Sequence, residues 1–324
     1  MSTKRSANTE FDFLKRLRTG RSLARLGDDC AVFPADPGNS YLITSDMLVE
    51  DVDFRLVWAS PQRIGHKALA VSLSDIAAMG GTPIWAMVSI AVPKTLWNKG
   101  FVEHFYEGWF DLAKTFGVEL IGGDLSSSPD RVSIDSTVIG KCPTGDIVYR
   151  GGAIPGDDIY VTGSLGGAAA GLKLLEDGHR ENENHSITND LILRQLKPEP
   201  QTEIGKWLSE NDRATSMIDL SDGISGDLRH ICEAGGVGAE IYAERLPLAF
   251  GANIIFKDRQ QMLSAALSGG DDLELLFTTR PNFVSRRRTP RLTRIGRITD
   301  RAGVIDLIDG EKHIPLSPDS FRHF

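Results

Sequence analysis

The stretch Ser72-Leu-Ser-Asp-Ile-Ala-Ala-Met-Gly80 decides how we interpret the rest of the chain, because it places the carboxylate of Asp75 in a helical pattern of small and apolar residues. A buried or half-buried carboxylate is costly unless a cation or hydrogen-bond donors compensate it. The nearest upstream basic residue, Lys67, is about two helical turns away. We therefore expect a cation supplied from elsewhere to meet Asp75.

Four other segments share one pattern, in which a strand or turn rich in glycine or serine ends in aspartate: Gly27–Asp29, Thr44–Asp46, Gly122–Asp124 and Asp219–Asp222. Any one of these aspartates alone is more often a turn or capping residue. Five sites together favour a shared metal site. If these carboxylates converge, they need cations to remain ionised, because two like charges ~4 Å apart repel by ~4 kcal/mol at an effective dielectric constant of ~20. Oxygen ligands without histidine or cysteine select Mg²⁺, and several Mg²⁺ ions indicate a polyphosphate substrate.

Length and composition predict a two-domain enzyme of ordinary soluble type, with residues 1–146 and 147–324 as the two domains. The chain has 324 residues, 41% of them hydrophobic and 25% charged, and a net charge of −8. That charge argues against nucleic acid as a main partner. We find no signal peptide and no membrane-spanning run, and the three scattered cysteines indicate buried reduced thiols. We therefore expect a cytoplasmic protein without a membrane partner.

Hydrophobic periodicity predicts alternating helices and strands. Residues 61–80 form a long helix entered through Ser60-Pro61, and residues 31–33 and 41–46 form an antiparallel hairpin that places Asp29 and Asp46 at strand ends. We expect a single helix over residues 96–116, a strand over 118–124 that ends at Asp124, and a loose surface segment over 179–190.

Two nucleotide-binding signals have alternative interpretations. Gly166–Lys173 has the glycine spacing of a P-loop, but Leu172 and Lys173 occupy the positions of the lysine and the Ser/Thr, so we reject that motif. Arg150, beside a glycine pair, is either a phosphate contact or a surface arginine. The basic cluster Arg286–Arg297 lacks interleaved aromatic residues and is more consistent with a solvated loop and strand edge than with nucleic-acid binding.

Eight motifs, taken together, resemble the thiamine-monophosphate kinase family, and they run in order along essentially the whole chain. They are Gly27–Ala31, Thr44–Glu50, Lys67–Gly80, Ile121–Asp124, Pro155–Asp157, Val161–Gly163, Ile218–Ile224 and Ser268–Leu275. The resemblance implies the PurM-like architecture of the aminoimidazole ribonucleotide synthetase superfamily, an α/β fold of the α+β type. Its N-terminal mixed sheet would join that of a second copy in a dimer barrel, and its C-terminal domain would be α/β.

The same resemblance implies a reaction and a set of site residues. Members of the family transfer the γ-phosphate of ATP directly, in line, to thiamine monophosphate, giving thiamine diphosphate with several Mg²⁺ ions and no phospho-enzyme. The implied metal ligands are Asp29, Thr44, Ser45, Asp46, Asp75, Asp124, Asp219 and Asp222. The implied ATP contacts are Tyr106, Gly123, Asp124, Arg150 and Ser221. The implied substrate contacts are Asp53, Asp271 and Phe321.

We expect no general base, because the acceptor is a phosphate oxygen with no difficult proton to remove. The chain departs from the family at Asp53, where a histidine is often found, and at Asp271, where glutamate is common.

Other functions remain as alternatives. A sister ATP-using enzyme, such as an amidine-forming synthetase, would share the fold. A selenophosphate synthetase is disfavoured because no reactive cysteine lies in a glycine-rich N-terminal arm, and a carbamoyl-dehydrating relative because Ser320–Phe324 lacks a terminal cysteine. A non-catalytic nucleotide-binding module is disfavoured because the aspartate set is complete.

Overall fold

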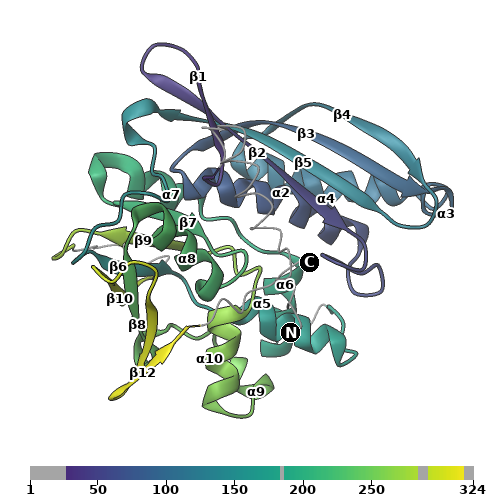
Figure 1. Ribbon diagram of the computed structural model, residues 1–324. Helices are drawn as coiled ribbons and strands as arrows, with labels where there is room; N and C mark the ends of the chain where they lie inside the picture. Colours follow the sequence, from purple (N-terminus) through teal and green to yellow (C-terminus); the bar gives the residue numbers. More distant parts are fainter. Residues whose placement is uncertain (1–26, 183–185, 284–290, 317–324) are drawn as a thin grey trace, which may run out of the picture.

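Two β-sheets, one from each half of the chain, form the frame of the computed structural model, which describes residues 27–182, 186–283 and 291–316 (Figure 1). The first sheet has the order β1-β2-β5-β3-β4, and only its β3–β4 pair is parallel. Its strands are β1 (Ala31–Pro34), β2 (Asn39–Val49), β3 (Thr82–Pro93), β4 (Glu119–Ser128) and β5 (Ser133–Pro143). Helices α2 (Pro61–Ala78) and α4 (Phe101–Phe116) cover one face, and the described residues leave the other face open.

The second sheet has the order β12-β11-β8-β10-β6-β9-β7. Its strands are β6 (Asp158–Thr162), β7 (Ser216–Asp219), β8 (Gly238–Tyr242), β9 (Leu275–Thr279), β10 (Leu292–Thr299), β11 (Ile305–Asp309) and β12 (Lys312–Pro315). The helices of this half are α5 (Gly167–Glu176), α6 (Ile187–Leu196), α7 (Thr202–Ser209), α8 (Ile224–Gly235), α9 (Ala252–Ile255) and α10 (Arg259–Ser268). Helices α8 and α10 share one hydrophobic core with the sheet, and α7 shares another with it. The two sheets and their helices confirm the predicted two-domain fold class.

Helix α2 lies between the two halves of the molecule. Its start follows the predicted cap, since the Ser60 hydroxyl accepts a hydrogen bond from the Arg63 N–H at 3.3 Å and Pro61 occupies the first turn. Near its start the helix crosses α4 at very short range, because a Cβ added at Gly65 would lie 2.0 Å from the Phe105 carbonyl oxygen. Only glycine fits at that crossing.

The C-terminal end of α2 contacts the second half of the chain. Ala77 and Ala78 share a core with Phe277 of β9, and a Cβ added at Gly205 of α7 would lie 2.1 Å from the Ala77 carbonyl oxygen. Asp75 is therefore carried by the helix that joins the two sheets. The structural role of the stretch Ser72–Gly80 is thus to carry a carboxylate to the place where the two sheets meet.

The predicted hairpin is confirmed, because β1 and β2 pair antiparallel, but four other element predictions are wrong. Asp46 lies inside β2 rather than at its end, and Asp124 likewise lies inside β4. The helix expected over residues 96–116 is interrupted: α3 (Lys94–Trp97) ends before Gly100, whose φ of 74° is left-handed, and α4 starts after it.

A fourth error is the missed helix α6. Ser186 caps it by accepting a hydrogen bond from the Asn189 N–H, and Leu191, Ile192 and Leu196 are buried along one face. The polar residues just before it hid this periodicity.

Helices able to cross a bilayer are absent from the described ranges, since none is both long and apolar enough. All three cysteines are buried free thiols, as predicted: Cys30, Cys142 and Cys232.

Candidate active site

A cleft of about 1380 Å³ runs alongside α2, where the two halves of the chain meet. One wall contains α2 and the segment 46–59, and the other contains parts of α5, α6 and α10 with the loops that follow β7 and α10. A pocket for one drug-sized ligand commonly encloses about 300–1000 Å³, so this cleft has room for more than one small molecule.

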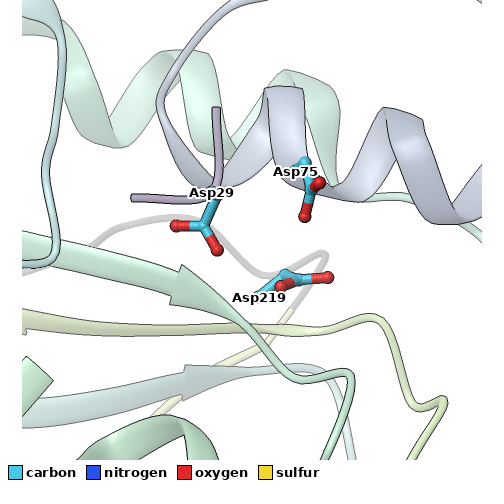
Figure 2. A group of neighbouring side chains, drawn as sticks. All are labelled: Asp29, Asp75 and Asp219. Carbon is cyan, nitrogen blue, oxygen red and sulfur yellow. The ribbon is translucent and has the colours of Figure 1, made fainter. Parts of the chain in front are cut away.

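Three carboxylates converge beside this cleft (Figure 2). Asp29, Asp75 and Asp219 each offer one oxygen, and these oxygens lie within 4.8 Å of one another. Asp29 precedes β1, Asp75 lies on α2 and Asp219 is the last residue of β7, so both halves of the chain contribute. The structure thus brings together three of the predicted metal ligands.

Neighbouring hydroxyl groups fix the orientation of the aspartates. Thr44 donates a hydrogen bond from its Oγ1 to Asp75 Oδ2, and Ser74 donates from its Oγ to Asp219 Oδ2 at 2.7 Å. Asp46 also lines the cleft, and its Oδ2 accepts a hydrogen bond at 2.7 Å from the hydroxyl of the buried Ser72. Each bond engages one carboxylate oxygen.

Among the described residues, Arg150 supplies the one positive charge that forms an ion pair with a member of the three carboxylates, Asp29. Its guanidinium pairs with Asp29 through Nη2 to Oδ1 at 2.7 Å and Nε to Oδ2 at 3.3 Å. Its backbone N–H donates to Asp28 Oδ1 at 2.8 Å. Arg150 is therefore a part-buried residue of this site and not a free surface arginine.

The aspartates carry more negative charge than these contacts compensate. Burial raises the pKa of Asp75 well above its usual range, and the charges of Asp46 and Asp219 raise it further. Burial also raises the pKa of Asp219 to about 7 and that of Asp46 to about 6. For Asp29, burial raises the pKa although Arg150 opposes the change. A set of oxygen ligands with raised pKa values fits a hard divalent cation such as Mg²⁺.

Asp124 does not join the three converging carboxylates. Side chains alternate between the two faces of a strand. In the pairing of β3 with β4, Asp124 lies opposite Ser89, which is exposed. Gly123 lies opposite Val88, which is buried on the face that the helices cover. Asp124 therefore lies on the open face of the first sheet.

Ser45 and Tyr106 also lie apart from the cluster. The Ser45 hydroxyl is exposed on the open face of the first sheet and contacts Asp135 and Thr137 at 3.0 and 3.1 Å. Tyr106 lies on α4, where its ring packs edge-on against Phe105, and it is not among the residues that line the cleft.

Ser221, a predicted ATP contact, and Asp222, a predicted metal ligand, line the cleft in the loop that follows β7. The Asp222 backbone N–H donates to the buried carboxylate of Asp227 at 3.2 Å, which ties this loop to the first turn of α8. Burial raises the pKa of Asp227 well above its usual range, and the negative charge of Asp222 raises it further. The sequence reasoning did not single out Asp227.

The two predicted substrate residues that fall in the described chain meet around one lysine. Lys67 donates from Nζ to Asp271 Oδ2 at 2.8 Å and to the Asp53 backbone carbonyl at 3.3 Å. The Asp53 carboxylate accepts from the Val49 N–H at 2.7 Å. Lys67 and both aspartates line the cleft. A lysine in an otherwise apolar helix was the same kind of signal as Asp75, and its role was missed.

Phe321 and Arg286–Arg288 lie outside the described residues. Two other arginines of the basic cluster form ion pairs within the second sheet: Arg294 with Asp158 at 2.6 Å and Arg297 with Glu240 at 2.9 Å. Both side chains are about half exposed, at 40% and 54%, as expected for a solvated surface, but β10 pairs with β6 and β8, so the predicted strand edge is wrong.

Comparison with known proteins adds a family to this geometry. Residues 27–142 match the family model described as "AIR synthase related protein, N-terminal domain", and residues 155–305 match its "C-terminal domain". Thiamine-monophosphate kinase of Bacillus subtilis (strain 168) is 40% identical over 253 residues, which are 78% of this chain and 76% of that protein. The chain belongs to the thiamine-monophosphate kinase family.

Further relatives agree with membership in the thiamine-monophosphate kinase family. The Escherichia coli (strain K12) protein of that name is 38% identical over 268 residues, covering 82% of this chain and 80% of that protein. A solved structure titled "AaThiL complexed with AMPPCP and TMP" matches with a TM-score of 0.87 and 30% identity over 98% of this chain and 97% of that one. The chain is thus a kinase with the PurM-like fold that its motifs predicted.

Proposed function

We propose that the chain transfers the γ-phosphoryl group of ATP directly to the phosphate of thiamine monophosphate, giving thiamine diphosphate and ADP. The observation that carries this proposal is the convergence of Asp29, Asp75 and Asp219 beside a cleft with room for two ligands. The relative whose title names both AMPPCP and TMP supports ATP and thiamine monophosphate as the two substrates.

Several Mg²⁺ ions are part of the proposal, and the donor set fits them because it consists of carboxylate and hydroxyl oxygens. The residues that would hold them are Asp29, Thr44, Asp46, Asp75, Asp219 and Asp222. When bound, Mg²⁺ would neutralise the negative charge of the phosphate groups. Ser45, Gly123 and Asp124 stay predicted contacts to be tested, since they lie on the open face or edge strand of the first sheet.

The protein's own residues contribute positioning rather than proton transfer. Ser72, Ser74 and Thr44 hold the aspartates in fixed orientations, so little reorganisation accompanies the reaction. Lys67 joins the segment of Asp53 to Asp271 and so sets the shape of the cleft where the second substrate would bind. We assign no general base, because the acceptor is an ionised phosphate oxygen.

The test is ADP release by the purified protein with Mg²⁺ and ATP, measured alone, with thiamine monophosphate and with substrates of amidine-forming synthetases. We expect stimulation by thiamine monophosphate only. Stimulation by an amidine precursor would instead identify a sister synthetase. ATP binding without stimulated turnover would identify a nucleotide-binding module.

We also propose a homodimer and retain the domain division at residues 1–146 and 147–324. The open face of the first sheet exposes Met47 by 63% and Met87 by 37% and carries the half-buried Ile43, Trp85 and Ile139. Large apolar side chains exposed on a sheet face, here beside polar ones, often mark a contact with a partner. A second copy of the chain would cover it.

A further inference from the structure

The loop after α10 has an unusual backbone at the point where it enters the cleft. Asp271 has a φ of 65° and Leu273 a φ of 47°, both in the left-handed region that non-glycine residues rarely adopt. The backbone N–H of Asp271 donates to the Ser221 carbonyl at 2.9 Å, and that of Leu273 to the Leu220 carbonyl at 3.0 Å. Such conformations persist only where the surroundings enforce them, and they cluster at functional sites.

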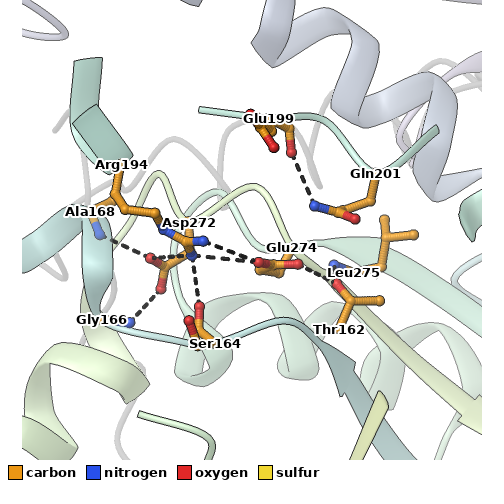
Figure 3. Close-up of polar contacts among 10 residues, drawn as sticks. All are labelled: Thr162, Ser164, Gly166, Ala168, Arg194, Glu199, Gln201, Asp272, Glu274 and Leu275. Atoms are coloured by element: carbon orange, nitrogen blue, oxygen red, sulfur yellow. Dashed lines mark hydrogen bonds and ion pairs between the residues drawn. The ribbon is translucent and has the colours of Figure 1, made fainter. Parts of the chain in front are cut away.

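A buried network of charged groups anchors the residues on either side of Leu273 (Figure 3). The Asp272 carboxylate accepts hydrogen bonds from the backbone N–H groups of Gly166 and Ala168, at 2.6 and 3.0 Å, at the start of α5. The Glu274 carboxylate accepts a hydrogen bond from Thr162 at 2.6 Å. Both acidic side chains are only 3% exposed, so they need a compensating cation.

That cation is Arg194 of α6. Its Nη2 lies 3.4 Å from Glu274 and 3.7 Å from Asp272, and it donates to the Ser164 carbonyl at 2.8 Å. One guanidinium therefore fixes two alternate residues of the strained loop against the segment that leads into α5.

The next residue on the same helix holds the loop residue that faces the cleft. Gln195 Nε2 donates to Asp271 Oδ2 at 2.9 Å, the same oxygen that Lys67 contacts at 2.8 Å. The side-chain hydrogen bonds that the described residues donate to Asp271 thus both end on Oδ2. The Asp271 side chain is 35% exposed and lines the cleft, so its other oxygen is available to a ligand.

We propose that Arg194 and Gln195, consecutive residues of α6, are positioning residues for the acceptor substrate. Arg194 fixes the loop through Asp272 and Glu274, and Gln195 fixes the Asp271 carboxylate, so that Asp271 presents one oxygen to thiamine monophosphate in a set direction. This proposal rests on the proposed function. Among the described residues, the side chains of Arg194 and Gln195 form hydrogen bonds or ion pairs with the loop after α10 and with Ser164 and not with Asp29, Asp75 or Asp219, so we expect the larger effect on the acceptor substrate.

The test compares the KM values of the two substrates in variants of both residues. Gln195→Glu keeps the side-chain volume but places a carboxylate against Asp271, and Gln195→Met removes the hydrogen bond without adding charge. We expect each to raise the KM for thiamine monophosphate by about tenfold or more while the KM for ATP changes by less than about twofold. Gln260→Glu, the same chemical change on the exposed side of α10, is the matched control.

Arg194 is tested by rescue. Arg194→Met should raise the KM for thiamine monophosphate in the same selective way, and Arg194→Lys should restore part of the loss because it keeps the charge without the planar fork. Equal changes in both KM values, or a lower Tm with both KM values unchanged, would overturn the proposal. A wild-type protein that thiamine monophosphate does not stimulate would instead refute the proposed function itself, so the two failures are distinguishable.

Discussion

Hydrogen bonds from hydroxyl groups fix the orientation of the aspartates in the cleft. Thr44, Ser72 and Ser74 each donate one hydrogen bond to a different aspartate. Each bond ends on Oδ2 of its aspartate and does not involve Oδ1. A carboxylate held in this way has lost most of its rotational freedom before a cation arrives. The effect of an aspartate substitution should therefore appear in turnover rather than in folding.

Asp46→Asn tests this expectation. The change keeps the size of the side chain and its bond to Ser72 but removes the charge, so we expect turnover to fall by about a hundredfold or more, with the Tm unchanged or raised. The measurement is steady-state ADP release combined with thermal unfolding. Asp300→Asn, in an exposed turn, is the matched control and should leave turnover intact. Near-normal turnover of Asp46→Asn at low Mg²⁺ would contradict the shared-metal site.

The raised pKa values predict how Mg²⁺ stabilises the protein at different pH. Burial raises the pKa of Asp46 from 3.8 to about 6 and that of Asp219 to about 7. Between 3.8 and these values the folded state binds protons that the unfolded state has released, so these groups make the metal-free protein less stable as pH rises through that window. Mg²⁺ binds the deprotonated carboxylates and should restore this loss.

We therefore expect the Mg²⁺-induced rise in Tm to be small at pH 5.5 and larger at pH 8, with most of the increase between pH 6 and 7. Thermal unfolding with Mg²⁺ and with a chelator at each pH measures it, and the difference between the two removes the contribution of titrating groups that do not interact with the metal. A Mg²⁺ effect that is constant or decreases over this range would exclude the carboxylates as the binding groups.

Single residues were predictable where a charge interrupted an apolar pattern. Asp75 was found in this way, whereas Asp29 and Asp219 were found in segments rich in glycine or serine that carry aspartate, and the structure brings the three together. Lys67 carried the same signal, but its partner is 204 positions away, so only the fold reveals the contact. Arg194 and Gln195 could not be found, because the helix that orients them was not predicted.

At the scale of elements, close helix crossings position the site. Helix α2 carries Asp75, Lys67 and the two serine hydroxyls, and it approaches α4 through Gly65 and α7 through Gly205. Its long apolar pattern and its Ser60-Pro61 start made it predictable. The edge strand β4 was cut short in the prediction because glycine and serine are poor strand formers, yet pairing with β3 carries it to Ser128.

Gly65→Ala tests the crossing of α2 and α4. The added Cβ would lie 2.0 Å from the Phe105 carbonyl oxygen, so the helices must move apart. We expect a loss of about 1–3 kcal/mol in the free energy of unfolding, measured by urea denaturation. Gly145→Ala is the matched control, since a Cβ there meets nothing within 4 Å. Equal stability of the two variants would show that the helices tolerate a wider crossing.

At the scale of the whole molecule, the open apolar face of the first sheet predicts association. We expect the protein to sediment at twice the mass of one chain, and Met47→Lys combined with Met87→Lys to shift it toward the monomer, because two ammonium groups would have to be buried in the interface. Phe250→Lys, at an 84% exposed position on the other half of the chain, is the control. A wild-type monomer at every concentration would contradict the dimer.

The central claim is that carboxylates from both halves of the chain assemble a Mg²⁺-dependent site for transfer between two phosphates. The most direct test follows the transferred group itself, with ATP labelled at the γ-phosphate, thiamine monophosphate and Mg²⁺. We predict that the label appears in the terminal phosphate of thiamine diphosphate, in step with ADP, and that a chelator abolishes it. Label found only in inorganic phosphate, or transfer that persists without divalent cations, would contradict the account.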